Sequence, residues 1–567
     1  MIIRVAASAL LLGSTPVLAA DADAIWFGGP VLTVNDKTPR AEAVAVKDGK
    51  IVAVGSRKAV LAAQKGRATR LIDLKGHTLI PGFVDGHSHF VGVGLQAVSA
   101  NLMPLPDGPV RSIADIQRIM RNFIAASPEV KAWGIAIGFN YDDSQLAEQR
   151  APTRQELDSV STTIPIMLLH QSGHLGAYNS KAIGIGGITP ATPNPSGGII
   201  QREADGRTPN GVFEENGHFL LAAKVLPKFT PEQLAAQVVA AQNIYLANGI
   251  TTAQDGKTDA ASTEVLIRAA SDHVLKLDVV SYVDLVVMKD SPVLRGPYMS
   301  RDYTDHFRIG GVKLTFDGSP QGKTAWFTKP YLQVPDGQAA DYAGYPAFPG
   351  PGEAQGWVDM AYRNSWQLLI HANGDAAIDQ MIATVGVAER AYPGEERRTV
   401  LIHGQYLRAD QIPQVKAERI FPALFPMHTF YWGDWHRQSV AGPERAAFIS
   451  PTGALLKAGM KFSIHSDAPV TFPNSMRVFD SAVNRTTRTG HVLGPDQRIS
   501  PAMALKAMTL WPAWQHFEGQ SKGSLEVGKR ADMVVLSANP LQVSQGTIKD
   551  IKVLETIKDG ISAYTAP

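Results

Sequence analysis

The stretch Pro81-Gly-Phe-Val-Asp-Gly-His87-Ser-His89 follows a short apolar run, 78–80, and predicts the end of a buried strand. Side chains two positions apart on an extended strand point in the same direction. His87 and His89 therefore present two imidazoles to one point, an arrangement that suits a metal ion. Two histidines in this pattern, without further support, more often make ordinary hydrogen bonds. The metal interpretation therefore needs support from other strands.

Three further predicted strands supply that support, because each leads into a residue that can bind a metal or move a proton. These residues are His371, His403 and Asp467. Four strand ends of this kind are hard to explain by structural histidines alone. Imidazole nitrogens and carboxylate oxygens are suitable ligands for Zn²⁺, Mn²⁺ or Fe²⁺. The pattern therefore predicts a metal centre.

Lys313 is a fifth candidate, because it lies inside the apolar strand predicted at 311–315. An ammonium group is costly to bury, so this lysine must be neutralised, paired or modified. The alternative is that its side chain extends to a carboxylate such as Asp317. The residues alone favour neither interpretation.

The middle of the chain alternates apolar strands with helical stretches, which indicates a parallel sheet with crossover helices. Strands are predicted at 164–169, 279–283, 311–315, 367–370, 399–402 and 461–464, and helices at 231–248, 375–391 and 501–508. In a (β/α)₈ barrel the chemistry lies at the carboxyl ends of the strands. Residues from about 102 to 211 are rich in Pro, Gly and Asn, and predict an insertion over the barrel mouth.

Both ends of the chain are β-rich. Strands are predicted at 25–34, at 43–55 around the turn Asp48-Gly49-Lys50, at 531–536, and in a hairpin around Asp559-Gly560. We expect the two ends to pair into one small β domain, with 21–80 as its N-terminal part and 520–567 as its C-terminal part. The barrel would occupy 81–519.

Residues 1–20 combine one positive charge, an apolar run and an Ala-rich end, which predicts a signal peptide. No later segment has about 18 consecutive apolar residues, so we expect no stable membrane anchor after cleavage, and a periplasmic or secreted bacterial protein. The net charge of +2 argues against nucleic acid as a partner. The absence of cysteine from the sequence excludes disulfides and thiolate zinc sites.

The chain resembles the amidohydrolase superfamily in the histidine and aspartate motifs above and in its C-terminal segment, 523–536. It resembles in particular amidohydrolase family 3, the branch that contains N-substituted formamide deformylase. The further motifs are Pro152-Thr-Arg154, Gly173-His174, Gly211-Val-Phe-Glu-Glu215 and Val312-Lys313-Leu314. The resemblance covers nearly the whole mature chain, and it implies a distorted (β/α)₈ TIM barrel with a β-sandwich made from both chain ends.

The resemblance also implies roles for the candidate ligands. His87 and His89 would bind the more buried ion of one or two divalent metals, with zinc the expected element. His371 and His403 would bind the second ion, and a carbamylated Lys313 would bridge the two. Asp467 would be both a ligand and the general base.

The reaction expected from this set is hydrolysis of a non-peptide C–N bond in a small amide, N-acyl or N-formyl compound by metal-activated water. His174 and Glu215 occupy matched family positions and would contact the substrate. Other residues near the mouth, including His428 and Trp432, are expected to be packing or surface residues. Two alternatives stay open: the same centre acting on an ester, lactone or cyclic amide, and an inactive protein that binds a small solute. The sequence also allows a homo-oligomer.

Overall fold

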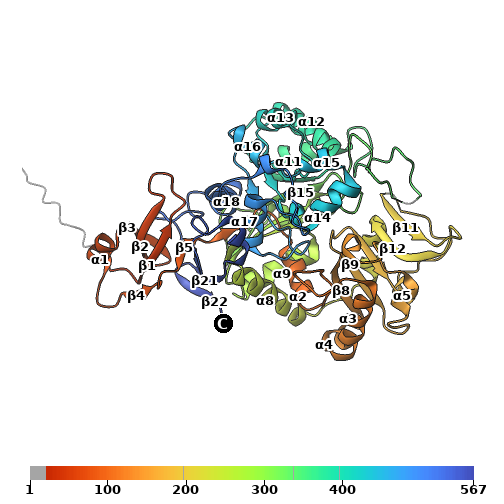
Figure 1. Cartoon of the computed structure of the whole chain (residues 1–567), viewed down its shortest axis with the longest axis horizontal. Coiled ribbons are helices and arrows are strands. Elements are labelled where there is room, and N and C mark those ends of the chain that lie inside the picture. The colour runs from red at the N-terminus through yellow and green to blue at the C-terminus, as the bar shows by residue number, and fades with distance from the viewer. Residues whose placement is uncertain (1–20, 196, 336, 395) are drawn as a thin grey trace, which may run out of the picture.

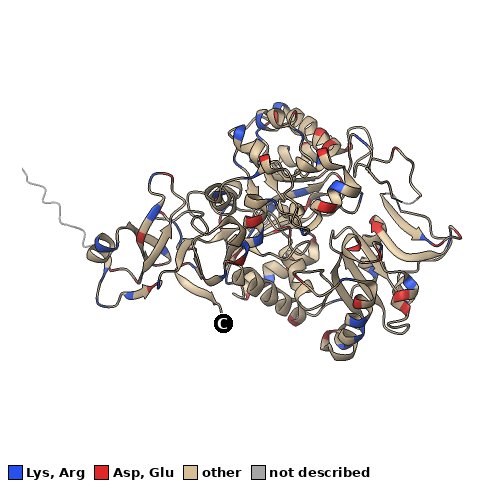
Figure 2. Ribbon diagram, in the orientation of Figure 1, with Lys and Arg blue, Asp and Glu red and all other residues tan. Residues whose placement is uncertain are grey.

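The computed structural model describes residues 21–195, 197–335, 337–394 and 396–567 (Figure 1). The predicted signal peptide, 1–20, lies outside these residues and stays a prediction. The described residues form a terminal β domain, a central parallel sheet and an insertion, which follow one another across Figure 1. Figure 2 shows acidic and basic residues spread over all three parts. None of the described helices is long and apolar enough to cross a membrane.

The central sheet has eight strands in the order β6-β13-β14-β15-β16-β17-β18-β19, and all its pairings are parallel. Its strands are almost entirely buried, as expected for a parallel sheet covered by crossover helices. The strands are β6 (Phe83–Val84), β13 (Ile250–Thr258), β14 (Asp278–Asp284), β15 (Phe307–Thr315), β16 (Gln367–Ala372), β17 (Val400–His403), β18 (Phe421–Leu424) and β19 (Ser463–Ile464).

The three predicted helices are confirmed as α8 (Pro231–Ala247), α12 (Asp375–Ala391) and α18 (Pro501–Met508). Thr230 and Gln233 form a reciprocal capping box at the start of α8, where Pro231 needs no hydrogen-bond partner for its nitrogen. The buried residues of α12 include Ile378, Met381, Ile382 and Val385, whose spacing forms one apolar face. The other crossover helices include α9 (Ala260–Ser271), α11 (Glu353–Arg363), α13 (Ile412–Ala417) and α16 (Thr452–Lys457).

The central sheet curls until its edge strands, β6 and β19, approach each other. The Asp467 N–H donates to the His87 carbonyl at 3.2 Å, and the His89 N–H donates to the Ala468 carbonyl at 2.6 Å. The described strands β6 and β19 each have two residues and are not paired with each other. The structure therefore shows a curled parallel sheet whose edges are joined by the backbone of two loops, instead of a barrel closed by strand pairing.

Both ends of the chain contribute to a second sheet, in the order β22-β21-β20-β5-β1-β2-β3, with β4 beside β1. The two ends meet where β5 pairs antiparallel with β20. The expected pairing of the ends is present, but a two-layer sandwich is not confirmed. The strands are β1 (Ala24–Leu32), β2 (Arg40–Lys47), β3 (Lys50–Gly55), β4 (Arg70–Asp73), β5 (Thr78–Pro81), β20 (Met533–Leu536), β21 (Val553–Lys558) and β22 (Ile561–Thr565).

The predicted insertion falls in a third, separate sheet with the order β11-β12-β10-β9-β8-β7. The strand predicted at 164–169 belongs to this sheet and not to the central one. Trp432 of α14 (Met427–Trp435) donates through Nε1 to Asp142 at 2.7 Å, which fastens the insertion to the central domain. The strands are β7 (Ala100–Asn101), β8 (Ala136–Tyr141), β9 (Ile166–His170), β10 (Leu175–Tyr178), β11 (Gly198–Arg202) and β12 (Pro209–Glu215).

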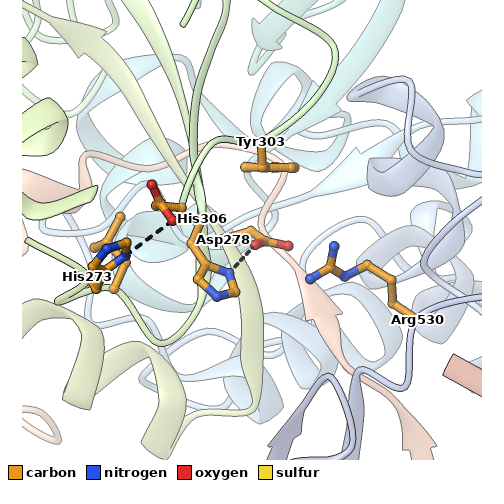
Figure 3. A pocket seen from close by; sticks show the side chains of 7 residues that line it. His273, Asp278, Tyr303, His306 and Arg530 are labelled. Carbon is orange, nitrogen blue, oxygen red and sulfur yellow. Dashed lines mark hydrogen bonds and ion pairs between the residues drawn. The ribbon is translucent and has the colours of Figure 1, made fainter. Parts of the chain in front are cut away.

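A buried charge network joins the amino ends of the central strands to the terminal β domain. Asp278, the first residue of β14, lies 2.5 Å from Lys522 and 2.7 Å from Lys558. It also lies 2.7 Å from His306, as Figure 3 shows. Lys522 also lies 2.6 Å from Glu518. The network satisfies charges that burial would otherwise make very costly.

A second cation, Arg308, contacts Glu518 at 2.6 Å. Burial raises the pKa of Glu518, but the charges of Lys522 and Arg308 outweigh burial and hold this pKa at about 2. A carboxylate with a lowered folded-state pKa stabilises the protein above its unfolded-state pKa. Glu518 should therefore stabilise the fold fully above about pH 5, and this stabilisation should be lost as the pH falls towards 2.

We predict that Glu518→Gln lowers the free energy of unfolding by about 3 kcal/mol at neutral pH, since the pKa of Glu518 is strongly lowered and two buried cations lose their partner. The difference from the wild type should shrink as the pH falls from about 5 to about 2. Urea unfolding over this pH range measures it. A difference that does not change with pH would contradict the role assigned to Glu518.

Candidate metal centre

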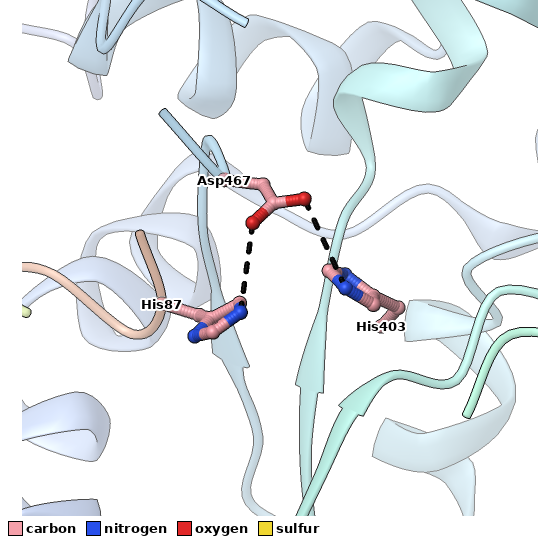
Figure 4. Close-up of side chains that lie close together, drawn as sticks. All are labelled: His87, His403 and Asp467. Atoms are coloured by element: carbon pink, nitrogen blue, oxygen red, sulfur yellow. Dashed lines mark ion pairs between the residues drawn. The ribbon is translucent and has the colours of Figure 1, made fainter. Parts of the chain in front are cut away.

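The carboxyl ends of the central strands bring predicted ligands together around Asp467 (Figure 4). The Asp467 carboxylate lies 3.5 Å from His87 Nε2, 3.3 Å from His89 Nε2 and 3.8 Å from His403 Nε2. His87, His403 and Asp467 each offer a ligand atom, and these three atoms all lie within 4.8 Å of one another. This is the buried triad of the following paragraphs.

Two members of the triad adopt a backbone conformation that is rare for residues with a side chain. His403 ends β17 with a φ of 73°, and Asp467 follows β19 with a φ of 55°. Positive φ is uncommon for residues other than glycine, although aspartate and histidine adopt it more readily than most, and such residues cluster at functional sites. In both cases the chain turns sharply just beyond a strand.

Lys313 lies at the same centre. Its Nζ is 3.1 Å from His87 Nε2, and the side chain is buried. Burial is the main cause that lowers the pKa of Lys313 to about 7. Asp317, the alternative partner for this lysine, instead accepts backbone N–H groups of Trp326, Asn373 and Gly374 at 2.7–3.0 Å. Lys313 therefore lies beside His87 at the candidate metal centre, and not against Asp317.

His371 lies beside the triad, with its ring 4.6 Å from that of His403. Its Nε2 is turned to the Gly318 carbonyl, at 3.1 Å. His174 lies 5.6 Å from His371 between ring centres, and its Nδ1 is 2.8 Å from Glu215 Oε2. His174 lines the pocket beside the triad, whereas Glu215 lies behind His174 and holds its ring.

The chemistry of these groups fits a divalent cation. Burial lowers the pKa of His87, His371 and His403 well below the usual histidine value, so these rings are neutral and have a lone pair to offer. His403 Nδ1 and Asp467 Oδ1 are buried without a hydrogen-bond partner. A buried polar atom without a partner costs about 1–3 kcal/mol, and a bound cation would remove the cost at the carboxylate.

Gln254, in the middle of β13, orients His87 and was missed by the sequence prediction. Its Oε1 is 2.6 Å from His87 Nδ1, and its Nε2 donates to the Gly86 carbonyl at 3.0 Å. The amide oxygen can only accept, so His87 carries its proton on Nδ1. The lone pair of His87 is therefore on Nε2, which faces Lys313 and Asp467.

The pocket beside the triad lies between the central strands and the insertion. It is lined by Ser172, His174, Ser319, Gln321, His371, Asn373, His403, Phe425, His428, Asp467 and Val470. His428, which was expected to be a packing or surface residue, is buried and also lines this pocket. His465 is buried beside the centre, with its Nε2 3.3 Å from the Ala423 carbonyl.

A second group of acidic and histidine side chains lies in the insertion and has an ordinary explanation. His170 Nε2 lies 2.9 Å from Asp143. The oxygens of Asp142 accept hydrogen bonds from Ser144 and Trp432. These contacts satisfy the hydrogen-bonding groups of Asp142, Asp143 and His170. The ion pair between His170 and Asp143 therefore has a structural explanation within the insertion.

Comparison with known proteins agrees with this geometry. The profile of the amidohydrolase family matches residues 70–564. N-substituted formamide deformylase of Arthrobacter pascens is 27% identical over 563 residues, which covers 96% of this chain and 98% of that protein.

Two solved structures share the fold. An uncharacterized metal-dependent hydrolase from Pyrococcus horikoshii OT3 has a TM-score of 0.72 at 22% identity, covering 92% of this chain and 99% of that one. An adenosine deaminase from Xanthomonas campestris with bound zinc has a TM-score of 0.54 at 14% identity, covering 96% of this chain and 94% of that one.

We predict that Gln254→Leu lowers the affinity for Zn²⁺ by about 10–100-fold, because His87 loses the group that fixes its tautomer. Titration of metal-stripped protein against a competing chelator measures this affinity. The matched control is Gln242→Leu, since Gln242 is also buried and bonds only to the backbone around Val274 and Lys276. Equal affinities in the two variants would show that Gln254 does not orient a ligand.

Proposed function

The chain belongs to the amidohydrolase family, and from that premise we propose that it hydrolyses a non-peptide C–N bond in a small amide, N-acyl or N-formyl compound. The observation that carries the proposal is the buried triad His87, His403 and Asp467, in which a carboxylate oxygen and an imidazole nitrogen have no hydrogen-bond partner. The likeness to N-substituted formamide deformylase supports the substrate class.

The residues that would hold one or two divalent ions are His87, His89, Lys313, His371, His403 and Asp467. The zinc-bound structure of similar fold supports Zn²⁺ as the element. A bound ion of this kind lowers the pKa of a coordinated water to about 7 and polarises a carbonyl group.

Asp467 is the residue placed to move the proton. Its carboxylate lines the pocket, and its three nearest ring neighbours are imidazoles. Burial keeps His87 and His403 neutral, and Asp467 is the one carboxyl group of the triad. We infer that Asp467 takes a proton from the attacking water and delivers it to the leaving nitrogen.

Lys313 supports a further part of the proposal. A buried amine with a pKa of about 7 is about half uncharged at neutral pH, and the uncharged form can attack carbon dioxide. The Nζ–C bond that forms gives a carbamate and releases one proton. The carbamate would turn a buried cation into an anionic ligand beside His87.

We predict that protein supplied with ¹³C-bicarbonate shows a carbamate carbon resonance that is absent from Lys313→Met. The signal should grow when Zn²⁺ is added, because the ion stabilises the anionic ligand. A spectrum without this resonance in metal-loaded wild-type protein would rule out the modification.

The proposed reaction is tested by elemental analysis of purified protein together with a screen of N-formyl and N-acyl amines. We expect a divalent metal in the protein, and activity that is lost with a chelator and restored by Zn²⁺ or Mn²⁺. Folded metal-free protein that gains no activity with either ion would contradict the proposal.

On the best amide from this screen, Asp467→Asn should lower kcat by about 10²–10⁴-fold, because the general base is removed. The control is Asp480→Asn on α17 (Ser475–Asn484), a buried aspartate that bonds to Asn484 away from the centre. If Asp467→Asn stays as active as this control, Asp467 is not the base. A protein that only binds solutes would show no turnover in any form.

A further inference from the structure

Three buried side chains form a hydrogen-bonded chain that ends at the pocket. Tyr406 Oη lies 2.8 Å from His436 Nδ1, and His436 Nε2 lies 3.0 Å from His428 Nδ1. The exposed fractions of Tyr406, His436 and His428 are only 7%, 0% and 2%. His428 lines the same pocket as His403 and Asp467. The chain therefore runs from the interior of the protein to the place where the substrate would bind.

The direction of these hydrogen bonds follows from the proton on Tyr406. Its hydroxyl has no other hydrogen-bond partner among the described residues, so the O–H donates to His436 Nδ1. Burial lowers the pKa of His436 to about 3 and that of His428 well below its usual value, so each ring carries one proton. His436 then donates from Nε2 to His428 Nδ1, and His428 carries its proton on Nε2.

The ring of His428 packs against two aromatic rings. Its centre lies 4.7 Å from that of Phe425 and 4.6 Å from that of Trp432. Trp432 is itself fixed by the hydrogen bond from its indole to Asp142. With Nδ1 engaged by His436, Nε2 is the ring nitrogen left to face the pocket, and it has no partner among the described residues. The result is a preorganised N–H donor, the kind of group that stabilises charge on a substrate oxygen.

We propose that His428 donates a hydrogen bond from Nε2 to the carbonyl oxygen of the substrate, and that Tyr406 and His436 are positioning residues that hold His428 in the required tautomer. The inference rests on the proposed function, because it concerns the same pocket. An amide offers its carbonyl oxygen as an acceptor, whereas its N–H group could not pair with this donor. The acyl side of the substrate would therefore face α14.

The tautomer is tested without turnover by long-range ¹H–¹⁵N correlation spectra of zinc-loaded protein labelled with ¹⁵N-histidine. The His428 signals are assigned by their loss in His428→Gln. We expect Nε2 to be protonated and Nδ1 unprotonated in the wild type, and a mixture of both tautomers in Tyr406→Phe. We also expect the Nε2–H resonance to shift on addition of acetate, the carboxylate product of an N-acetyl compound. A proton on Nδ1, or no shift with acetate, would overturn the proposal.

The contribution to catalysis is tested on the best amide from the screen. His428→Leu should lower kcat by about 10²–10³-fold, as the loss of one oxyanion donor does in other hydrolases. His428→Gln, which keeps an N–H donor, should recover part of this loss, and Tyr406→Phe should show a smaller loss.

The matched control is Tyr178→Phe, which removes a buried tyrosine–histidine hydrogen bond of the same length, 2.8 Å to His218, from the insertion. Equal losses in Tyr406→Phe and Tyr178→Phe would mean that only stability is affected, which would overturn the proposal. The two proposals fail differently. A wild-type protein inert to every amide contradicts the proposed function, whereas the spectra decide the tautomer and the donor without any turnover.

Discussion

The structure depends on one constraint: a carboxylate and several imidazoles are buried together at the seam where the curled sheet meets itself. Asp467 follows the last strand and His87 follows the first, and their backbones are hydrogen-bonded across that seam. The bond that closes the sheet and the contact that builds the centre therefore involve the same two residues. Any change in the curl of the sheet would separate Asp467 from its imidazole neighbours.

Burial has opposite consequences at the two ends of the central strands. At the amino ends, Asp278 and Glu518 stay charged because lysine and arginine side chains lie within 3 Å of them. At the carboxyl ends, desolvation and the neighbouring lysine and histidine side chains keep His87 and His403 neutral, although Asp467 lies within 4 Å of both. Neutral imidazoles have a free lone pair, which paired cations lack. The amino ends of the central strands therefore contribute to the stability of the fold, whereas the carboxyl ends are suited to binding a cation.

Elements outside the central sheet shape the pocket. The insertion contributes His174, which Glu215 holds from behind, and α14 contributes His428 and Trp432. Trp432 joins these two parts through its bond to Asp142. The metal ligands come from the sheet, whereas the groups that would meet a substrate come largely from its cover. The chemistry and the choice of substrate are thus set by different parts of the chain.

The sequence alone determined the features that depend on neighbouring residues. The helix at 375–391 and the polar residues at the ends of β16 and β17 followed from local periodicity, and the resemblance then joined His87, Lys313 and Asp467 into one set. Strand β13 was missed because most of its side chains are polar although buried, and β18 because Pro422 lies inside it.

Tertiary structure alone decided which strands share a sheet. It placed the strand predicted at 164–169 in the insertion, and it showed that loops join the edges of the central sheet. It also decided the proton positions on His87 and His428, because their partners Gln254 and His436 come from other elements. Contacts between segments far apart in the chain leave no local pattern, so their outcome appears only when the chain is folded.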